Sequence, residues 1–302
     1  TFFAYNNLGD NMEEYQKTVM RVSTVTLLGN LILAFFKILI GFISFSNAII
    51  SDGIHTASDV LSTVVVMVGV KLSSKESDLE HPYGHERFEC VAAIILAVML
   101  FLTALLIGYS GIIEIINPSN VKLKYGSLAI VIAVISIVAK EAMYWYTIIE
   151  AKRINSNAMK ADAWHHRSDA FSSIGSLVGV IGFYLGYYIL DAIASILICG
   201  FILKVAIEIF NDAIDQMIDH ACSREFQEDL ISLITEQSEI INIDDLKTRL
   251  FGNKVYVDLE VQVDGNDNLR HAHAIAHQVH DLIENNFPTV KHCNVHVNPS
   301  DS

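Results

Sequence analysis

The stretch FECVAAIILAVMLFLTALLIGYSGIIEII, residues 88–116, decides the fold of this chain. It is almost entirely apolar, and it exceeds the ~20 residues that a helix needs to cross the hydrocarbon core of a bilayer. Other segments reach that length with a mostly apolar composition, so the sequence predicts an α-helical membrane protein with six transmembrane helices. The predicted spans are Val19–Phe45, Ala48–Leu72, Phe88–Ile116, Tyr125–Ile149, Ala158–Leu190 and Asp191–Asn211.

The spans also predict an orientation in the membrane. The breaks around Ser44–Asn47 and Tyr187–Asp191 are short, which indicates tight hairpins between antiparallel neighbours. Basic residues gather on one side of the spans, and the positive-inside rule assigns this side to the cytoplasm. They are Lys17, Arg21, Lys71, Lys75, Arg87, Lys152, Arg153 and Lys160, against Lys122 and Lys124 on the other side. We expect an integral protein of the cell (inner) membrane with both termini cytoplasmic.

The composition favours cations as partners. The chain has 34 Asp and Glu against 20 Lys and Arg, and a formal net charge of −14. Without a run of clustered Lys and Arg, a nucleic-acid partner is not expected. Most of the twelve histidines follow Ala213. The four cysteines are scattered with no CxxC pair, which favours small core residues over a disulfide framework or a thiolate metal site.

The pattern changes after Asn211 and becomes typical of a small α+β domain. Ser223 is the expected N-cap of the first helix, and alternating apolar residues from 255 to 263 predict a half-buried strand. The expected elements are helices at Arg224–Ser238 and Ala272–Phe287 and strands at Ile243–Leu250, Val255–Val263 and Val290–Val297. This α-β-β-α-β order suits helices on one face of a sheet. The predicted domains are a cytoplasmic N-terminal segment (1–18), a membrane domain (19–211) and a cytoplasmic tail domain (212–302).

Two of the predicted spans contain ionisable residues, which are costly in a bilayer and usually functional. His55 and Asp59 lie in the second span, and His165 and Asp169 lie in the fifth. In both pairs the Asp follows the His by four residues, so the two side chains share one helix face. Two such faces can converge on one ion and offer two imidazole nitrogens and two carboxylate oxygens. That set suits a tetrahedral, zinc-like centre.

The competing interpretation is that these polar residues only tie helices together or lie near the membrane interface. The repeat of one spacing on a second span argues against it. Asp52 and His166 lie off the shared faces and are interpreted as helix-packing or water-cavity residues. Lys37 and the Lys140–Glu141 pair are interpreted as structural ion pairs or snorkelling groups.

A second candidate cluster lies in the loop after the second span, which reads SDLEHPYGH over residues 77–85. Asp78, His81 and His85 can gather around a metal ion because Pro82 and Gly84 permit a turn. A solvated acidic loop with incidental histidines is the alternative.

The six spans, the two HxxxD pairs, the HPYGH loop and the α+β tail together resemble the cation diffusion facilitator family of metal–proton antiporters, over nearly the whole chain. The resemblance implies a ferredoxin-like dimerisation domain in the tail, and therefore a homodimer. The transport site that it implies is His55, Asp59, His165 and Asp169, and the implied loop site is Asp78, His81 and His85.

The tail matches the family less closely. The positions that match a metal pair in this domain are Asp244, Asp258, His273, His296 and Asn298. Asn298 replaces a carboxylate with a weaker, neutral ligand, so metal binding in the tail is expected to be altered.

Two further features of the tail are predicted. His273, His277 and His280 form a stripe on the polar face of the second tail helix, for which a simple solvated surface is the alternative. The resemblance also matches Arg87 and Asp219 to a charge pair at the junction of membrane and tail.

The sequence thus predicts a divalent transition-metal efflux transporter with zinc as the favoured cargo, working by proton antiport as a homodimer in contact with membrane lipids. Imidazole binds metal only when neutral, and the unperturbed pKa of His is ~6.5, so metal and protons compete. A GxxxxGK[ST] nucleotide loop is absent from the sequence, which leaves the proton gradient as the energy source.

Several alternatives remain at the level of sequence. Manganese, iron(II), cobalt and cadmium are alternative cargoes, and metal can act as substrate or regulator rather than as a permanently bound cofactor. A membrane-anchored metal sensor is an alternative function. An intramembrane metalloenzyme is disfavoured, because no HExxH pair occurs and a four-ligand site leaves no position for catalytic water.

Overall fold

A computed structural model describes residues 2–43, 47–116, 126–185 and 189–300 of the chain. The chain forms two compact units. The membrane unit consists of Gln16–Lys75 and Phe88–Ala213. The tail unit consists of Thr1–Tyr15, the loop Glu76–Arg87 and Ile214–Ser302.

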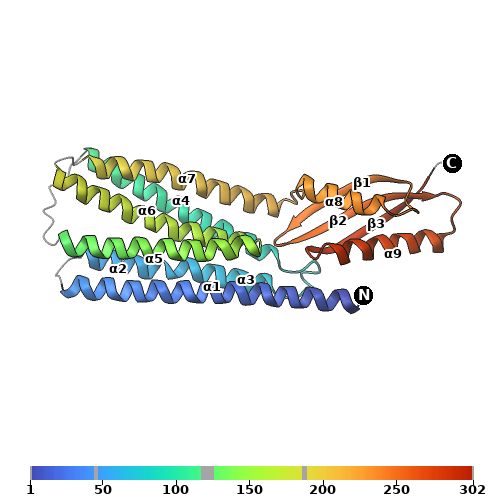
Figure 1. Ribbon diagram of the computed structural model, residues 1–302, viewed down its shortest axis with the longest axis horizontal. Helices are drawn as coiled ribbons and strands as arrows, with labels where there is room; N and C mark the ends of the chain where they lie inside the picture. The colour runs from blue at the N-terminus through green and yellow to red at the C-terminus, as the bar shows by residue number, and fades with distance from the viewer. Residues whose placement is uncertain (1, 44–46, 117–125, 186–188, 301–302) are drawn as a thin grey trace. The chain divides into compact units, whose positions relative to one another are not determined.

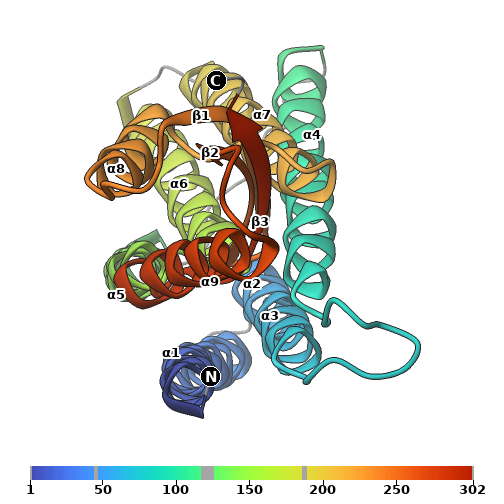
Figure 2. The ribbon, with the colours of Figure 1, turned by 90° about the vertical axis from the view of Figure 1, so that its right-hand side faces the viewer.

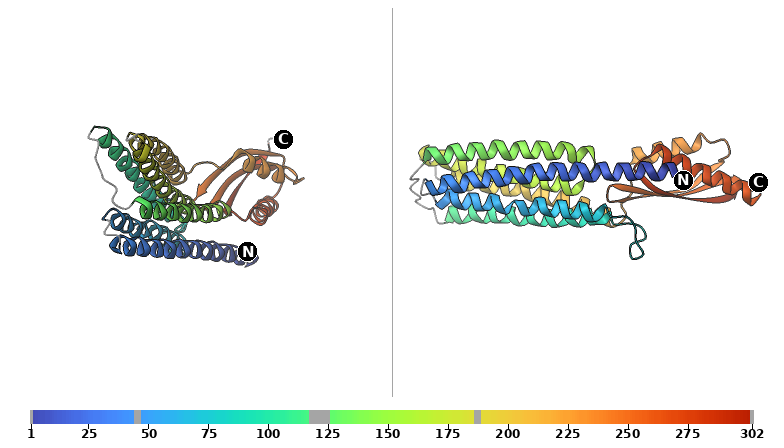
Figure 3. Two further views of the ribbon diagram at one scale, coloured as in Figure 1. Left: turned by 60° about the vertical axis from the view of Figure 1, so that its left-hand side comes forward. Right: turned by 90° about the horizontal axis from the view of Figure 1, so that it is seen from below.

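Long helices make up the described part of the membrane unit. They are α1 (Phe2–Ile43), α2 (Asn47–Ser58), α3 (Val60–Ser73), α4 (Arg87–Ile116), α5 (Gly126–Arg153), α6 (Asn157–Leu185) and α7 (Leu190–Met217). The part of α1 before Gln16 and the part of α7 after Ala213 belong to the tail unit. They run roughly alongside one another (Figures 1 and 3). The predicted hairpins at Ser44–Asn47 and Tyr187–Asp191 lie largely outside the described residues.

Five stretches of helix in the described part of the chain are long and apolar enough to cross a membrane. They are Glu14–Ile43, Asp52–Ser73, Arg87–Ile116, Ile130–Arg153 and Ala192–Met217. Helix α6 covers most of the remaining predicted span, but ionisable residues in its first half, including Asp162 and Asp169, make it less apolar. It packs against α5 and α3, so these groups are buried among helices. A membrane crossing by α6 therefore stays a prediction, whereas the helical membrane region is confirmed.

The side chains of the membrane unit are distributed as expected in a lipid environment. Large apolar residues such as Phe42, Leu106 and Leu197 are exposed, each with more than 60% of its surface accessible. A soluble protein rarely exposes so continuous an apolar surface. Small residues lie between the helices instead: a Cβ added at Gly69 would meet Ala92 of α4 at 2.4 Å. Such contacts let helices approach closely where no hydrophobic effect drives them together.

The tail unit is a three-stranded sheet with two helices on one face, which Figure 2 shows end-on. Its elements are α8 (Arg224–Thr235), β1 (Asn242–Phe251), β2 (Lys254–Asp264), α9 (Leu269–Asn286) and β3 (Val290–Ser300). The predicted α-β-β-α-β order is thereby confirmed. The sheet order is β1-β2-β3, with β1 antiparallel and β3 parallel to β2.

The core of the tail follows from the alternation that the sequence displays. Alternate residues of β2, Val257, Leu259 and Val261 among them, pack with Leu230 of α8 and Val279 of α9. The N-cap of α8 is formed as predicted, because the Ser223 hydroxyl accepts a hydrogen bond from the backbone N–H of Phe226 at 3.3 Å. Such a cap stabilises a helix by about 1 kcal/mol.

The opposite face of the sheet is covered in part by the loop Glu76–Arg87. The hydroxyl of Tyr256 and the ammonium of Lys291 donate to the Tyr83 carbonyl at 3.1 and 2.9 Å. Lys291 also forms an ion pair with Glu86. Burial here raises the pKa of Tyr256 to about 12, so the phenol stays a hydrogen-bond donor. The loop is therefore held as part of the tail unit.

Candidate metal centre

The first half of the predicted membrane site lies where α2 ends and α3 begins. Asp59 separates the two helices, but its backbone keeps helical angles (φ −63°, ψ −18°) and its N–H donates to the His55 carbonyl at 3.2 Å. The four-residue spacing therefore does place both side chains on one face. Asp59 is buried at 4% exposure, whereas His55 is exposed.

The second half comes from α6, a continuous helix. His165 and Asp169 are both buried, at 6% and 7% exposure. The structure brings ligand atoms of His55, Asp59 and Asp169 within 4.8 Å of one another. His165 lies just outside this group, with its Nε2 3.8 Å from Oδ1 of Asp59. The two HxxxD faces thus converge, and a single small ion can reach donors from both.

A lysine from a third helix bridges the two carboxylates of this cluster. The ammonium of Lys140, on α5, donates to Oδ2 of Asp59 at 2.6 Å and to Oδ2 of Asp169 at 2.8 Å. Lys140 is only 2% exposed. Two buried carboxylates this close repel each other strongly, and the ammonium compensates much of their charge. The sequence interpretation of Lys140 as an ion-paired residue is correct, but it missed that the partners are the candidate ligands themselves.

Behind the cluster, α6 is fixed to α3 by hydrogen bonds. The hydroxyls of Ser62 and Thr63 donate to Oδ1 of Asp162 at 3.0 and 3.4 Å. Nε2 of His166 lies 3.6 Å from the other oxygen of Asp162, and both residues are almost completely buried. His166 and Asp162 therefore belong to the helix-packing framework, as the sequence predicted for His166.

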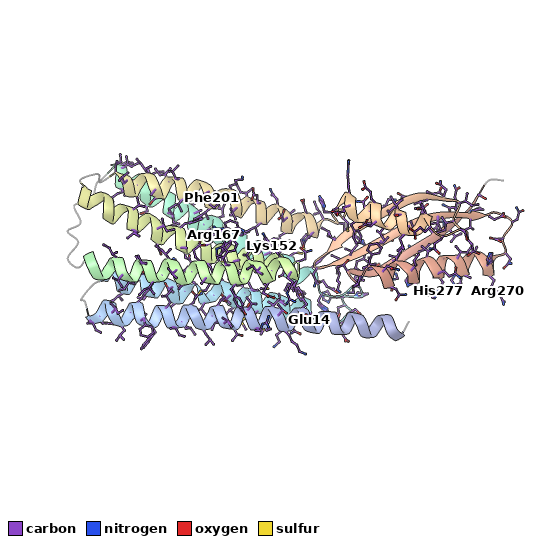
Figure 4. All side chains as sticks on the ribbon, viewed as in Figure 1. Glu14, Lys152, Arg167, Phe201, Arg270 and His277 are labelled. Carbon is purple, nitrogen blue, oxygen red and sulfur yellow. The ribbon has the colours of Figure 1, made fainter. Side chains whose placement is uncertain are left out.

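Glu141, next to Lys140 in sequence, has a different partner. Its carboxylate lies 3.4 Å from the Arg167 guanidinium of α6, and that guanidinium stacks 4.2 Å from the ring centroid of Tyr144. Figure 4 labels Arg167 near Phe201 of α7, whose ring packs 5.5 Å from that of Phe171. This arrangement fixes α6 between α5 and α7 beside the cluster.

Lys37 forms the ion pair that the sequence predicted. Its ammonium lies 2.8 Å from Asp52 and donates to the Thr56 hydroxyl at 3.0 Å, which links α1 to α2. Neither Lys37 nor Asp52 belongs to the cluster around Asp59.

The loop residues also come together. Nδ1 of His81 lies 3.3 Å from Asp78, and Nε2 of His85 lies 3.4 Å from the other oxygen of Asp78. Gly84 has a φ of +101°, a conformation that favours glycine, and its N–H donates to the His81 carbonyl at 3.0 Å. The turn that the sequence predicted from Pro82 and Gly84 thus gathers the three side chains.

Arg87 and Asp219 form an ion pair within the tail unit. Asp219 has a positive φ of 61°, so the chain turns sharply just after α7. The Arg87 guanidinium also stacks 4.8 Å from the ring centroid of Phe251, at the end of β1.

The ligands proposed for the tail are dispersed over four elements. Asp244 lies on β1, Asp258 on β2, His273 on α9 and His296 on β3. The described part of a single chain does not gather these four into one cluster. Asn298, the departure from the family pattern, donates to Asp244 at 2.9 Å and so occupies one of its carboxylate oxygens.

Comparison with known protein families gives matches to both units. Residues 23–218 match the cation efflux transmembrane domain, and residues 222–300 match the cytoplasmic domain of cation efflux proteins. The two matches together cover almost the whole chain, and the first covers more than half of it.

Curated relatives align over nearly the full length. An uncharacterized transporter of Methanocaldococcus jannaschii is 36% identical over 95% of this chain and 99% of its own. The manganese efflux system protein MneP of Bacillus subtilis is 29% identical over 95% of this chain and 98% of its own. Metal tolerance protein C1 of Arabidopsis thaliana is 30% identical over 96% of this chain and 65% of its own.

Proposed function

Since the chain belongs to the cation diffusion facilitator family, and is thus an integral membrane transporter for divalent metal cations, we propose that it exports zinc in exchange for protons through the cluster around Asp59 and Asp169. The observation that carries this proposal is the convergence of His55, Asp59 and Asp169 within 4.8 Å, with His165 beside them. The proposed efflux runs from a cytoplasmic side that also contains both termini.

The donor set supports zinc as the cargo. Two imidazole nitrogens and two carboxylate oxygens match the ligands that zinc takes in tetrahedral sites. Burial of Asp59, Asp169 and His165 at 4–7% exposure keeps competing water scarce. Zinc bound there would exchange its hydration shell for four protein donors, as a permeating ion must.

Lys140 supports a transport role over a permanent structural site. A divalent cation that binds the two carboxylates meets an ammonium already 2.6 and 2.8 Å from their oxygens. Repulsion between the two cations weakens metal binding. A site that must release its ion on the far side of the membrane benefits from such weakening. Oδ2 of Asp59 pairs with Lys140, whereas Oδ1 faces His165. A metal ion can therefore bind Oδ1 on the side of the histidine.

Proton coupling follows from the same donors. His55 and His165 bind metal through lone pairs that protons also take, so loading of one excludes the other. We propose that this competition, with the helices alternately exposing the site to the two sides, couples metal efflux to proton entry.

The tail supports assembly as a homodimer. Its cytoplasmic-domain match and its open, three-stranded sheet suit pairing of two copies, which would cover more of a small core. In this proposal the loop cluster of Asp78, His81 and His85 is a second cation site. The dispersed set of Asp244, Asp258, His273 and His296 binds metal only if a second chain or a rearrangement brings its members together.

Manganese is the second candidate cargo. The observation that favours it is the 29% identity to a manganese efflux protein of Bacillus subtilis over nearly the whole length of both chains. The two imidazole ligands favour zinc over manganese, because manganese prefers oxygen donors.

Uptake into inverted vesicles, measured ion by ion, tests the proposal. With an imposed pH gradient, we expect zinc uptake to exceed manganese uptake and to disappear in Asp169→Ala. Faster manganese uptake would replace zinc by manganese as the cargo. Uptake of both ions by the Asp169→Ala variant would overturn the assignment of the site.

A further inference from the structure

A third group of side chains that could hold a metal ion lies in the tail, and the sequence analysis assigned none of its members to a metal site, although it placed His280 in the histidine stripe. It consists of His280 and Glu284, one turn apart on α9, and His292 near the start of β3. One ligand atom from each lies within 4.8 Å of the other two. Spacing of four residues on a helix puts His280 and Glu284 on one face, and the crossover to β3 brings His292 beside them.

Two of the three distances between ligand atoms fit a tetrahedral metal centre. Oε1 of Glu284 lies 3.3 Å from Nε2 of His280 and 3.4 Å from Nδ1 of His292. Zinc bonds to nitrogen and oxygen are ~2.0–2.2 Å long, so tetrahedral geometry separates two ligand atoms by roughly 3.3–3.5 Å. The third pair of ligand atoms, on His280 and His292, lies within 4.8 Å, so side-chain rotation alone can bring all three donors to one ion.

Hydrogen bonds from outside the cluster orient two of the ligands. Nδ1 of His280 lies 2.6 Å from the carbonyl oxygen of Cys293, which only accepts, so Nδ1 carries a proton. In the neutral ring Nε2 then keeps its lone pair, and this lone pair faces the Glu284 carboxylate. Glu284 is held in turn by the backbone N–H of Cys293 at 3.1 Å. Histidine ligands of metals are oriented by such bonds to backbone carbonyls.

A lone pair facing a carboxylate is unfavourable unless a cation lies between them. The cation is either a second proton on His280 or a metal ion. Among the described residues, the other histidines of α9 belong to no such group of two imidazoles and one carboxylate. His277, which Figure 4 labels on α9, is 58% exposed and pairs with the Asp281 carboxylate at 3.0 Å. His280 is 29% exposed and Glu284 15%, whereas His292 is 58% exposed, so the two ligands on α9 are sheltered and the cluster is open to solvent on the His292 side.

We propose that His280, Glu284 and His292 form a binding site for a divalent transition-metal ion of the zinc type, with a fourth position open to water. Two nitrogens and one carboxylate oxygen are a ligand set that zinc takes in proteins. The site shares no residue with the transport cluster or with the set of Asp244, Asp258, His273 and His296. This proposal therefore does not depend on zinc being the cargo. Occupancy ties the last turns of α9 to the start of β3.

Cobalt(II) binding to the full-length protein in detergent tests this site. The background carries Asp59→Asn, Asp169→Asn and His81→Ala, so that the transport and loop clusters are weakened. In this background we expect His280→Ala/His292→Ala to lose one cobalt per chain, together with its visible absorption bands. The matched control is His271→Ala, since His271 also lies beside carboxylates, Glu239 at 3.3 Å and Asp267 at 3.8 Å, but without a second histidine. It should keep the full stoichiometry.

Two further measurements separate metal binding from loss of structure. Glu284→Gln keeps the size of the side chain and an acceptor for Cys293, and it should weaken cobalt binding at least tenfold. In the background protein with all three ligands, zinc should slow hydrogen–deuterium exchange in the peptides that cover 280–284 and 292. Unchanged stoichiometry in the double variant, or unchanged exchange on adding zinc, would show an imidazolium ion pair instead and overturn the proposal.

Discussion

The two helical segments that share the HxxxD spacing differ in how they hold it. In α6 both His165 and Asp169 are buried, and the helix is fixed to α3 through Asp162 and to α5 through Arg167. In the second span the helix is interrupted at Asp59, which is buried, while His55 is exposed. The same HxxxD spacing thus gives two different halves of the cluster. The half on α6 is buried and fixed by its neighbours, and the half formed by His55 and Asp59 is exposed at the histidine.

This difference suggests that the two halves of the proposed site have different roles in metal binding. A donor that is buried and fixed sets the geometry of bound metal, because its position barely changes when the ion leaves. An exposed donor beside an interruption in the helix meets the ion first. We therefore expect the α6 half to determine affinity and His55 to determine access and choice of ion.

Removal of a buried carboxylate should have the largest effect. Asp169→Ala and Asp59→Ala each take a charged ligand from the proposed four-donor site and leave Lys140 with one partner, so transport should fall by more than about 100-fold. Vesicle uptake measures this. Asp52→Ala is the matched control, since Asp52 also pairs with a buried lysine, Lys37, but lies outside the cluster. Uptake by Asp169→Ala equal to that of the control would contradict the site.

Lys140→Met should have the next largest effect, and it should act in opposite directions on binding and transport. Without the ammonium, two carboxylates attract the metal with less competition, so affinity should rise about tenfold while turnover falls because release slows. Isothermal calorimetry and vesicle uptake measure the two quantities. Lys37→Met, which removes a lysine of similar burial from another ion pair, should change neither by as much. Weaker metal binding in Lys140→Met would refute the role assigned to the ammonium.

The two histidines should differ in a direct comparison. His165→Ala removes a buried donor that water replaces poorly, and we expect metal affinity to fall by roughly 100-fold. His55→Ala removes a donor at the exposed edge of the cluster, and we expect a smaller loss of roughly tenfold. Calorimetry on both variants checks the order. Equal losses would show that burial does not distinguish the two halves.

The smallest effect is a change of selectivity. His55→Asp replaces an imidazole nitrogen ligand with a carboxylate oxygen, which is a harder donor. We expect manganese and cadmium uptake to rise relative to zinc uptake by about a few-fold. The same substitution at His165 is the comparison, because a third buried carboxylate beside Lys140 should reduce all uptake. Unchanged relative rates in His55→Asp would mean that the half formed by His55 and Asp59 does not select the ion.

Much of this architecture could be predicted from the sequence. Apolar length predicted the membrane helices, and alternation from Val255 to Val263 predicted the central strand of the tail. Helical periodicity is local, so His55 and Asp59 could be placed on one face without any knowledge of the fold. Gly84 and Pro82 likewise indicated the turn that gathers the loop residues.

The remaining features depend on contacts between distant parts of the chain. Lys140 contacts carboxylates 81 and 29 residues away, and no local pattern indicates which charges a buried lysine will meet. The tail cluster was missed for the same reason, since His292 reaches Glu284 only through the crossover to β3. The histidine stripe was seen, but its spacing alone does not distinguish His280, held by a backbone carbonyl, from the exposed His277.

The central claim is that metal and protons exchange at one buried cluster. It is tested most directly in proteoliposomes that enclose a pH-sensitive dye, with zinc added outside and no other gradient. We predict that zinc entry makes the lumen more alkaline as protons leave, and that Asp59→Ala and Asp169→Ala abolish both changes while Asp52→Ala does not. Zinc entry with no change of lumen pH in the unmodified protein would contradict the exchange mechanism.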